Sequence, residues 1–220
     1  LAWLGLAWDE GPALATADGM GFAAKGAAGP YVQSDRFDRY AAALDRLAAA
    51  GSLFPCDRSR KDLLQLASAP HAGVGMPAYP KVLRPADLAP DWYARYRSDP
   101  PTPRDGASAL RFRVDDAPVP FHDRVVLKRR DGIYAYQLAV VVDDIAMGVT
   151  EVVRGADLLD STGRQIQLVR ALGGTVPTYA HAPIVVNADG GKLSKRDEAL
   201  TLASLRGAGV DSERLVGALA

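Results

Sequence analysis

The apolar residues of this chain follow helical spacing most clearly between residues 34 and 50. Ser34 can cap the start of this helix by accepting from a free backbone N–H, and Gly51 can end it in the left-handed conformation. One face of the helix carries four apolar side chains: Phe37, Tyr40, Leu44 and Leu47. The pattern therefore predicts an amphipathic helix packed on a core.

A second helical pattern covers residues 162–172. Thr162 and Gln165 have the spacing of a capping box, in which each side chain bonds the backbone of the other residue. Gly173 and Gly174 follow the last apolar position and can end the helix. The predicted buried face carries Ile166, Val169 and Leu172.

Other segments read as strands or remain ambiguous. Short apolar runs predict strands at 110–114, 149–153 and 184–186, and a hairpin turns at 130–132. Residues 136–147 allow two interpretations, because consecutive valines favour a strand while the spacing of the other apolar residues fits a helix. A strand, a helix and a strand between residues 149 and 186 predict half of a parallel nucleotide-binding sheet, and therefore an α/β fold.

Composition narrows the class of protein. The chain has 220 residues, which suits one large domain or a domain with an insertion, and its 26 basic and 26 acidic residues give no net field for nucleic acid. Cys56 is the only cysteine, so an internal disulfide is excluded, and no apolar run is long enough for a membrane span. Eleven of the 15 prolines fall between residues 55 and 120, which predicts an irregular insertion. The aromatic residues of that insertion form either a small core or an RNA-binding surface: Trp92, Tyr93 and Tyr96.

The candidate chemistry lies after the last predicted strand. Gly190 and Gly191 let the backbone approach a ligand, and a cluster of cations and one hydroxyl follows, made up of Lys192, Ser194, Lys195 and Arg196. Because α/β sheets bind ligands at the carboxyl edge of their strands, this loop suits a polyphosphate. The alternative is a solvated basic turn without a ligand.

Residues 192–196, Lys-Leu-Ser-Lys-Arg, resemble the second signature of the class I aminoacyl-tRNA synthetases. The resemblance extends through the ordered blocks 134–144, 149–159 and 161–165, whose wording is similar to the glutamyl-tRNA synthetase family and closest to its glutamyl-Q branch. It implies a Rossmann-like fold with a helix at 136–147. The family's first signature, a His-Ile-Gly-His-type helix start, has no match in the chain. We therefore expect the chain to be a segment of a longer product and to form little glutamyl-adenylate alone.

The resemblance implies particular substrates and residues. ATP with Mg²⁺ would be bound by the loop Lys192, Ser194, Lys195 and Arg196, with Lys195 as the catalytic residue that stabilises charge on the phosphates. The side-chain carboxylate of glutamate would pair with Arg154, and the Tyr136 hydroxyl would donate one oriented hydrogen bond. The alternatives are a structural ion pair of Arg154 with Asp143, Asp144 or Asp157, and a core position for Tyr136.

The family often carries a zinc site in the insertion, which this chain preserves only in part. Cys56 and Tyr79 match that site, but Arg58 and Leu83 stand at the other thiolate positions. A structural zinc ion needs four ligands, so we expect no zinc. The resemblance divides the chain into a remainder of the first Rossmann half (1–54), a degenerate zinc-binding insertion (55–125), the second half (126–190), and the loop with a helical segment (191–220).

The implied activity is ATP-dependent activation of L-glutamate and its transfer to queuosine in the anticodon of tRNA(Asp). One alternative is a catalytic piece of a glutamyl-tRNA synthetase that charges tRNA(Glu). The other is a non-catalytic relative that binds nucleotide, amino acid or tRNA. We expect a cytoplasmic monomer without a membrane partner.

Overall fold

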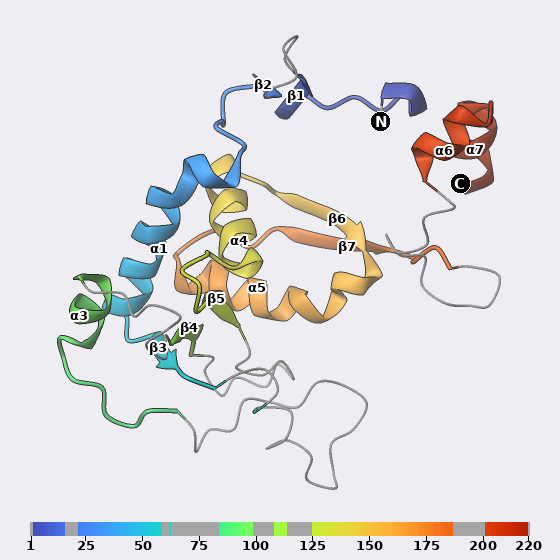
Figure 1. The fold of residues 1–220 in the computed structure, drawn as a ribbon. Coiled ribbons are helices and arrows are strands. Elements are labelled where there is room, and N and C mark those ends of the chain that lie inside the picture. Colours follow the sequence, from blue (N-terminus) through green and yellow to red (C-terminus); the bar gives the residue numbers. More distant parts are fainter. Residues whose placement is uncertain are drawn as a thin grey trace, which may run out of the picture. The chain divides into compact units, whose positions relative to one another are not determined.

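The computed structural model describes residues 2–15, 22–58, 62, 84–98, 108–113, 125–186 and 201–219. These residues form two compact units, one made of residues 1–31 and 182–220 and the other of residues 32–181. Helices and strands are both present (Figure 1). The larger unit contains most of the buried apolar residues.

Helix α1 (Phe37–Ala49) follows the 3-10 turn η2 (Gln33–Arg36). Three of its four predicted face residues are fully buried, and Phe37 is 44% exposed. The helix ends as predicted: Gly51 has a φ of +66°, and the N–H of Ser52 reaches back to the Leu47 carbonyl at 2.8 Å. The predicted Ser34 cap is wrong, because Ser34 lies inside η2, where no side chain caps the helix start.

The strands β3 (Leu53–Cys56), β4 (Ala109–Phe112) and β5 (Val126–Lys128) form a sheet in the order β3-β4-β5. Both pairings are antiparallel, with Leu53 opposite Phe112. The central strand β4 is buried at every position, whereas the sequence predicted alternation over 110–114. Burial at successive positions means that both faces of β4 are covered, so the strand has no solvent side. The predicted turn follows β5, with a φ of +81° at Gly132.

Helix α4 (Tyr136–Met147) occupies the ambiguous segment and has the bounds that the resemblance implies. Leu138, Val141 and Val142 are buried, and α4 contacts both α1 and α5. Burial of this face outweighs the modest strand preference of the consecutive valines. The helix ends at Gly148, which has a φ of +66°.

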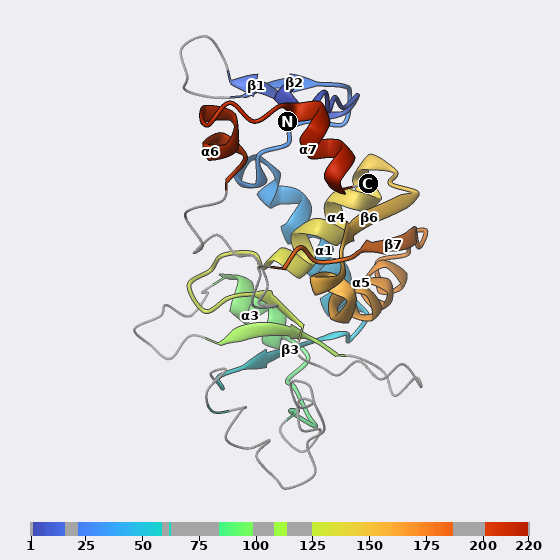
Figure 2. The ribbon, with the colours of Figure 1, turned by 90° about the vertical axis from the view of Figure 1, so that its right-hand side faces the viewer.

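Strand β6 (Glu151–Gly155), the turn η5 (Ala156–Leu158), helix α5 (Leu159–Ala171) and strand β7 (Thr178–Ala182) follow in order. The N–H of Thr178 reaches the Thr150 carbonyl at 3.0 Å, so both paired strands begin at the same end and run parallel. The β-α-β order is the predicted one (Figure 1), but its second strand lies at Thr178–Ala182 and not at 184–186. Figures 1 and 2 show this pair and the three-stranded sheet in separate parts of the unit.

Two sequence predictions fail in this region. The capping box is wrong, because α5 begins at Leu159 and places Thr162 and Gln165 inside the helix. The predicted buried strand at 184–186 is also wrong, since β7 ends at Ala182 and these three residues are exposed. Pro183 follows β7 directly and has no N–H to continue the ladder. Gly173, with a φ of +70°, ends α5 as predicted.

Helix α3 (Trp92–Ser98) carries the aromatic residues of the proline-rich region. Trp92, Tyr93 and Tyr96 are half-buried and pack against the main core. The Tyr93 hydroxyl donates to Asp45 of α1 at 3.0 Å. These contacts agree with the core interpretation of the three residues.

The smaller unit contains the turn η1 (Ala2–Leu4), an antiparallel pair of strands β1 (Gly11–Ala15) and β2 (Phe22–Lys25), and two short helices. Helices α6 (Leu202–Gly207) and α7 (Ser212–Leu219) lie in the predicted helical segment that follows the basic loop. Thr201 caps α6 through a capping box with Ser204. The smaller unit therefore adds a hairpin and capped helices.

Candidate active site

Arg154 lies near the carboxyl end of β6, with its guanidinium held by the first turns of α5. Its Nη1 donates to Gln165 Oε1 at 2.6 Å, and its Nη2 donates to Thr162 Oγ1 at 2.8 Å and to the Leu158 carbonyl at 3.4 Å. The guanidinium lies over the ring of Tyr179 at 5.1 Å from its centroid, a cation–π contact. The position of the cation is thus set from several sides by uncharged groups.

A second line of contacts joins this arginine to the start of α4. Gln165 Nε2 donates to Gln137 Oε1 at 2.9 Å, and Gln137 Nε2 donates to Ser161 Oγ at 3.1 Å. Gln137 directly follows Tyr136, the first residue of α4, whose side chain is 53% exposed. The structure therefore connects the two predicted glutamate-binding segments through glutamine side chains, and it places Tyr136 on the surface and outside the core.

His181 on β7 completes the surroundings of Arg154. Its Nε2 lies 3.4 Å from Arg154 Nε and 3.0 Å from Thr162 Oγ1. A guanidinium only donates hydrogen bonds, so Nε2 accepts and the ring proton is on Nδ1. These contacts join β7 to Arg154 and to α5, which is the role of a structural histidine.

Helix α4 carries two adjacent carboxylates, Asp143 and Asp144. Asp143 pairs with the buried Arg36 at 2.8 Å and accepts from the Tyr40 hydroxyl at 2.9 Å, so it serves η2 and α1. Burial raises the pKa of the Asp144 carboxyl, neighbouring Asp143 raises it further, and the charge of Arg154 opposes the rise. The charge of Arg154 thus acts on the Asp144 carboxyl. The contacts on the guanidinium itself come from neutral groups, in contrast to the ion pair considered from sequence.

Sequence reasoning missed the residues that hold Arg154. Thr162 and Gln165 were interpreted as helix caps, and Gln137 and Tyr179 were given no role. The sequence did contain a sign of the role of Gln165. At helical spacing this residue lies on the face that carries Val169 and Leu172, so a polar side chain was expected on a face predicted to be buried. Gln165 is indeed 2% exposed, and such a buried amide needs hydrogen-bonding partners.

The remaining predicted site residues are placed as follows. The basic loop (Lys192, Ser194, Lys195 and Arg196) and Tyr79 of the degenerate zinc site lie outside the described residues. Cys56 is buried in β3 beside Phe54 and Leu88, and its thiol lies 3.9 Å from the Arg58 carbonyl. Within the described ranges, no group of three or more His, Cys, Asp or Glu side chains is arranged to hold a metal ion. The absence of zinc stays a prediction.

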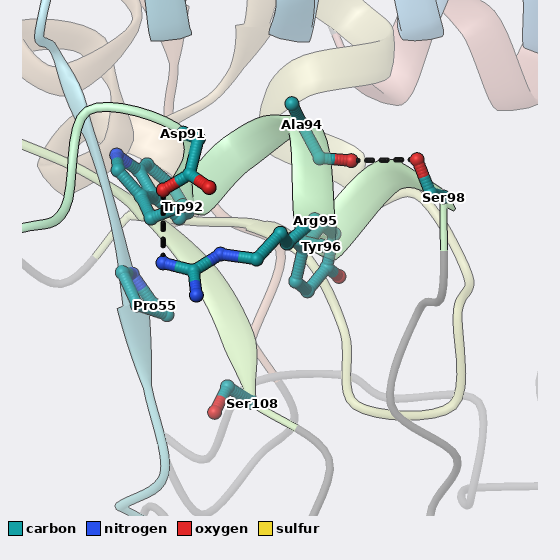
Figure 3. Close-up of a pocket in the computed structure, with 8 residues that line it drawn as sticks. All are labelled: Pro55, Asp91, Trp92, Ala94, Arg95, Tyr96, Ser98 and Ser108. Carbon is teal, nitrogen blue, oxygen red and sulfur yellow. Dashed lines mark hydrogen bonds and ion pairs between the residues drawn. The ribbon is translucent and has the colours of Figure 1, made fainter.

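An open pocket of about 680 Å³ lies elsewhere, between α3, Pro55 of β3 and Ser108 (Figure 3). Its wall includes Trp92, Tyr96 and the exposed ion pair of Arg95 with Asp91 at 2.9 Å. Neither Tyr136 nor Arg154 is among the described residues that line it. Among the described helices, none is long and apolar enough to cross a membrane.

Comparison with known proteins gives consistent matches. A family model described as the catalytic domain of class I tRNA synthetases (E and Q) matches residues 91–220. The chain is 45% identical over 235 residues to the glutamyl-Q tRNA(Asp) synthetase of Symbiobacterium thermophilum, covering 100% of this chain and 68% of that protein. It is 43% identical to the Nitratidesulfovibrio vulgaris protein of the same name, covering 100% of this chain and 67% of the relative.

A third relative and a solved structure agree. The Geobacter sulfurreducens glutamyl-Q tRNA(Asp) synthetase is 49% identical over 191 residues, which is 79% of this chain and 56% of the relative. The crystal structure of glutamate-tRNA synthetase from Elizabethkingia anophelis matches 90% of this chain with a TM-score of 0.63 and 25% identity. This chain spans only 41% of that structure's length.

Proposed function

This chain belongs to the class I tRNA synthetases of the E and Q group, in the glutamyl-Q tRNA(Asp) synthetase family, and we propose that it activates L-glutamate with ATP and transfers it to queuosine in tRNA(Asp). Family membership and the α/β class of the synthetase catalytic domain confirm the predictions made from the signature blocks. The substrates named for the relatives are the basis for assigning substrates to this chain.

The observation that supports glutamate as the amino acid is the environment of Arg154. A half-buried guanidinium, fixed at the end of β6 by neutral partners, keeps its charge available for an anionic ligand. A side-chain carboxylate of the substrate would satisfy that charge through charge-assisted hydrogen bonds. The exposed hydroxyl of Tyr136, at the start of α4, would orient the same substrate. These roles of Arg154 and Tyr136 are part of our proposal.

Activation joins the α-carboxylate of glutamate to the α-phosphorus of ATP and releases pyrophosphate. Negative charge on the phosphates then needs stabilisation, which positioned cations supply without covalent chemistry of their own. We assign this role to Lys195, with Lys192, Ser194 and Arg196 binding the phosphates, on the strength of their match to the family's second signature. Mg²⁺ bound to ATP would contribute further positive charge.

Transfer of labelled glutamate to defined RNAs tests the proposal. Labelled glutamate, ATP and the full-length protein are incubated with tRNA(Asp) carrying queuosine, tRNA(Asp) carrying guanosine at the same position, or tRNA(Glu). We expect label only on the queuosine-containing tRNA. Label on tRNA(Glu) would instead support the glutamyl-tRNA synthetase function, for which the 25% identical solved structure is the supporting observation.

The non-catalytic alternative is tested by a second assay, glutamate-dependent pyrophosphate exchange. It predicts no glutamate-dependent exchange between pyrophosphate and ATP, with binding of nucleotide, amino acid or tRNA retained.

Sedimentation of the protein alone and with tRNA would test the further proposal that the protein acts as a monomer. Fractionation of cells would test the proposed cytoplasmic location.

A further inference from the structure

Gln165 is the most deeply buried side chain in contact with the Arg154 guanidinium. Its residue is 2% exposed, and its amide is bound on both sides, by Arg154 Nη1 at 2.6 Å and by Gln137 Oε1 at 2.9 Å. Since a guanidinium can only donate, the amide oxygen must face Arg154 and the amide nitrogen must face Gln137. The orientation of Gln165 is therefore fixed by the chemistry of its two neighbours.

The amide is significant because a carboxylate of the same shape would fit the same place. An oxygen at 2.6 Å from Nη1 in a buried position would form a strong ion pair if it carried a negative charge. The neutral amide accepts the hydrogen bond and orients the guanidinium without placing a negative charge in contact with it, and Asp144 acts on Arg154 only from outside these contacts. The other described contacts of Arg154 are also neutral: Thr162, the Leu158 carbonyl, His181 and Tyr179.

We infer that Gln165 determines specificity at this site: it positions the Arg154 guanidinium through a neutral oxygen and so reserves the positive charge for an anionic amino-acid side chain. This inference rests on the proposed function of Arg154 as the glutamate-binding cation. Gln165 acts through Arg154 and is a positioning residue. A carboxylate at this position would pair with Arg154 internally and remove the preference for glutamate over glutamine.

The hydrogen-bonding capacity of Arg154 is compatible with this role. A guanidinium has five N–H groups. Nε is directed at His181, both hydrogens of Nη2 have acceptors in Thr162 and Leu158, and one hydrogen of Nη1 is directed at Gln165. Within the described part of the chain, the second Nη1 hydrogen has no assigned acceptor. A substrate carboxylate would meet Nη1 there, on the nitrogen that Gln165 positions.

The test compares two substitutions at one position with two amino acids. Dissociation constants for L-glutamate and L-glutamine are measured by calorimetry for the full-length parent, Gln165→Glu and Gln165→Leu, with thermal unfolding as a check on folding. Gln165→Glu should raise the dissociation constant for glutamate by about tenfold to a hundredfold and change that for glutamine by less than about threefold. Only glutamate carries a side-chain anion that competes with the new carboxylate for Arg154. Gln165→Leu removes the hydrogen bond to Arg154 without adding charge. The affinity for glutamate should therefore fall, while the preference for glutamate over glutamine persists.

The comparison between substrates separates this effect from general damage. A merely structural role would weaken the binding of both amino acids together. An unchanged ratio of the dissociation constants for glutamate and glutamine in a folded Gln165→Glu variant overturns the inference. If that variant does not fold, an unchanged glutamate affinity in Gln165→Leu overturns it instead. Arg154→Leu is the reference: if this variant binds glutamate as the parent does, the proposed function of Arg154 fails. If Arg154→Leu loses glutamate binding and Gln165→Glu retains it, only the role of Gln165 fails.

Discussion

Replacing Arg154 with leucine should abolish tight binding of glutamate while leaving a folded protein. The substitution removes the cation that the proposed function places opposite the substrate carboxylate. Removing one partner of a buried, hydrogen-bonded charge pair costs about 2 to 5 kcal/mol of binding free energy, which is roughly a 30- to 5,000-fold rise in Kd. Glutamine, whose side chain has no charge to satisfy, should be affected much less.

The same substitution has a predictable effect on stability. Gln165 Oε1 loses its donor at 2.6 Å and stays buried, whereas Thr162 Oγ1 keeps His181 Nε2 at 3.0 Å. One unsatisfied buried acceptor lowers the free energy of unfolding by about 1 to 3 kcal/mol. Urea unfolding followed by tryptophan fluorescence at the temperature of the calorimetry measures this loss and shows whether the variant is folded there.

Arg154→Lys is the matched control, since it keeps the charge but loses the planar fork that contacts Gln165 and Thr162 together. Its glutamate affinity should lie between those of the parent and of Arg154→Leu. Calorimetry under identical salt and pH compares the three proteins. A folded Arg154→Leu variant with the Kd of the parent for glutamate would refute the assignment, and the ordered neutral surroundings of Arg154 would then be purely structural.

Three further predictions concern the loop, the metal and alkaline pH. Lys195→Ala should slow glutamate-dependent pyrophosphate exchange by roughly 30- to 1,000-fold, about 2 to 4 kcal/mol of transition-state stabilisation, with little change in unfolding; an unchanged exchange rate would remove Lys195 from catalysis. Elemental analysis after dialysis should find no zinc, and one zinc ion per chain would contradict the loss of the site. Burial, with the hydrogen bond to Asp143, raises the pKa of Tyr40 from 10.0 to about 12, so the folded state keeps a proton that the unfolded chain loses. The contribution of the protonated Tyr40 hydroxyl to the free energy of unfolding should be complete below pH 10 and decline as the pH rises toward 12. In the Tyr40→Phe variant, the free energy of unfolding measured with urea should fall less over this pH range.

The sequence by itself determined the features that depend on local geometry or on a contiguous motif. Gly51 and Gly173 each adopt a positive φ at a predicted helix end, as glycine permits without steric cost. The apolar face of α1 and the order of strand, helix and strand after residue 149 also follow from spacing along the chain, although the second strand lies at Thr178–Ala182 and not at the predicted 184–186. The family could be identified from sequence because its signature blocks are continuous in the chain.

Tertiary structure decided where polar side chains find their partners. A threonine followed by a glutamine at this spacing is a helix-cap signal when only the local chain is considered, yet Thr162 and Gln165 turn toward Arg154 on a neighbouring strand. Strand β4, predicted to be half-exposed, is covered on both faces and buried at every position, including Arg111. Such partners come from segments distant in sequence, and propensity or periodicity encodes only which residues share a face. The assembled sheet and helices determine what that face meets, and in this protein they surround Arg154 with neutral acceptors.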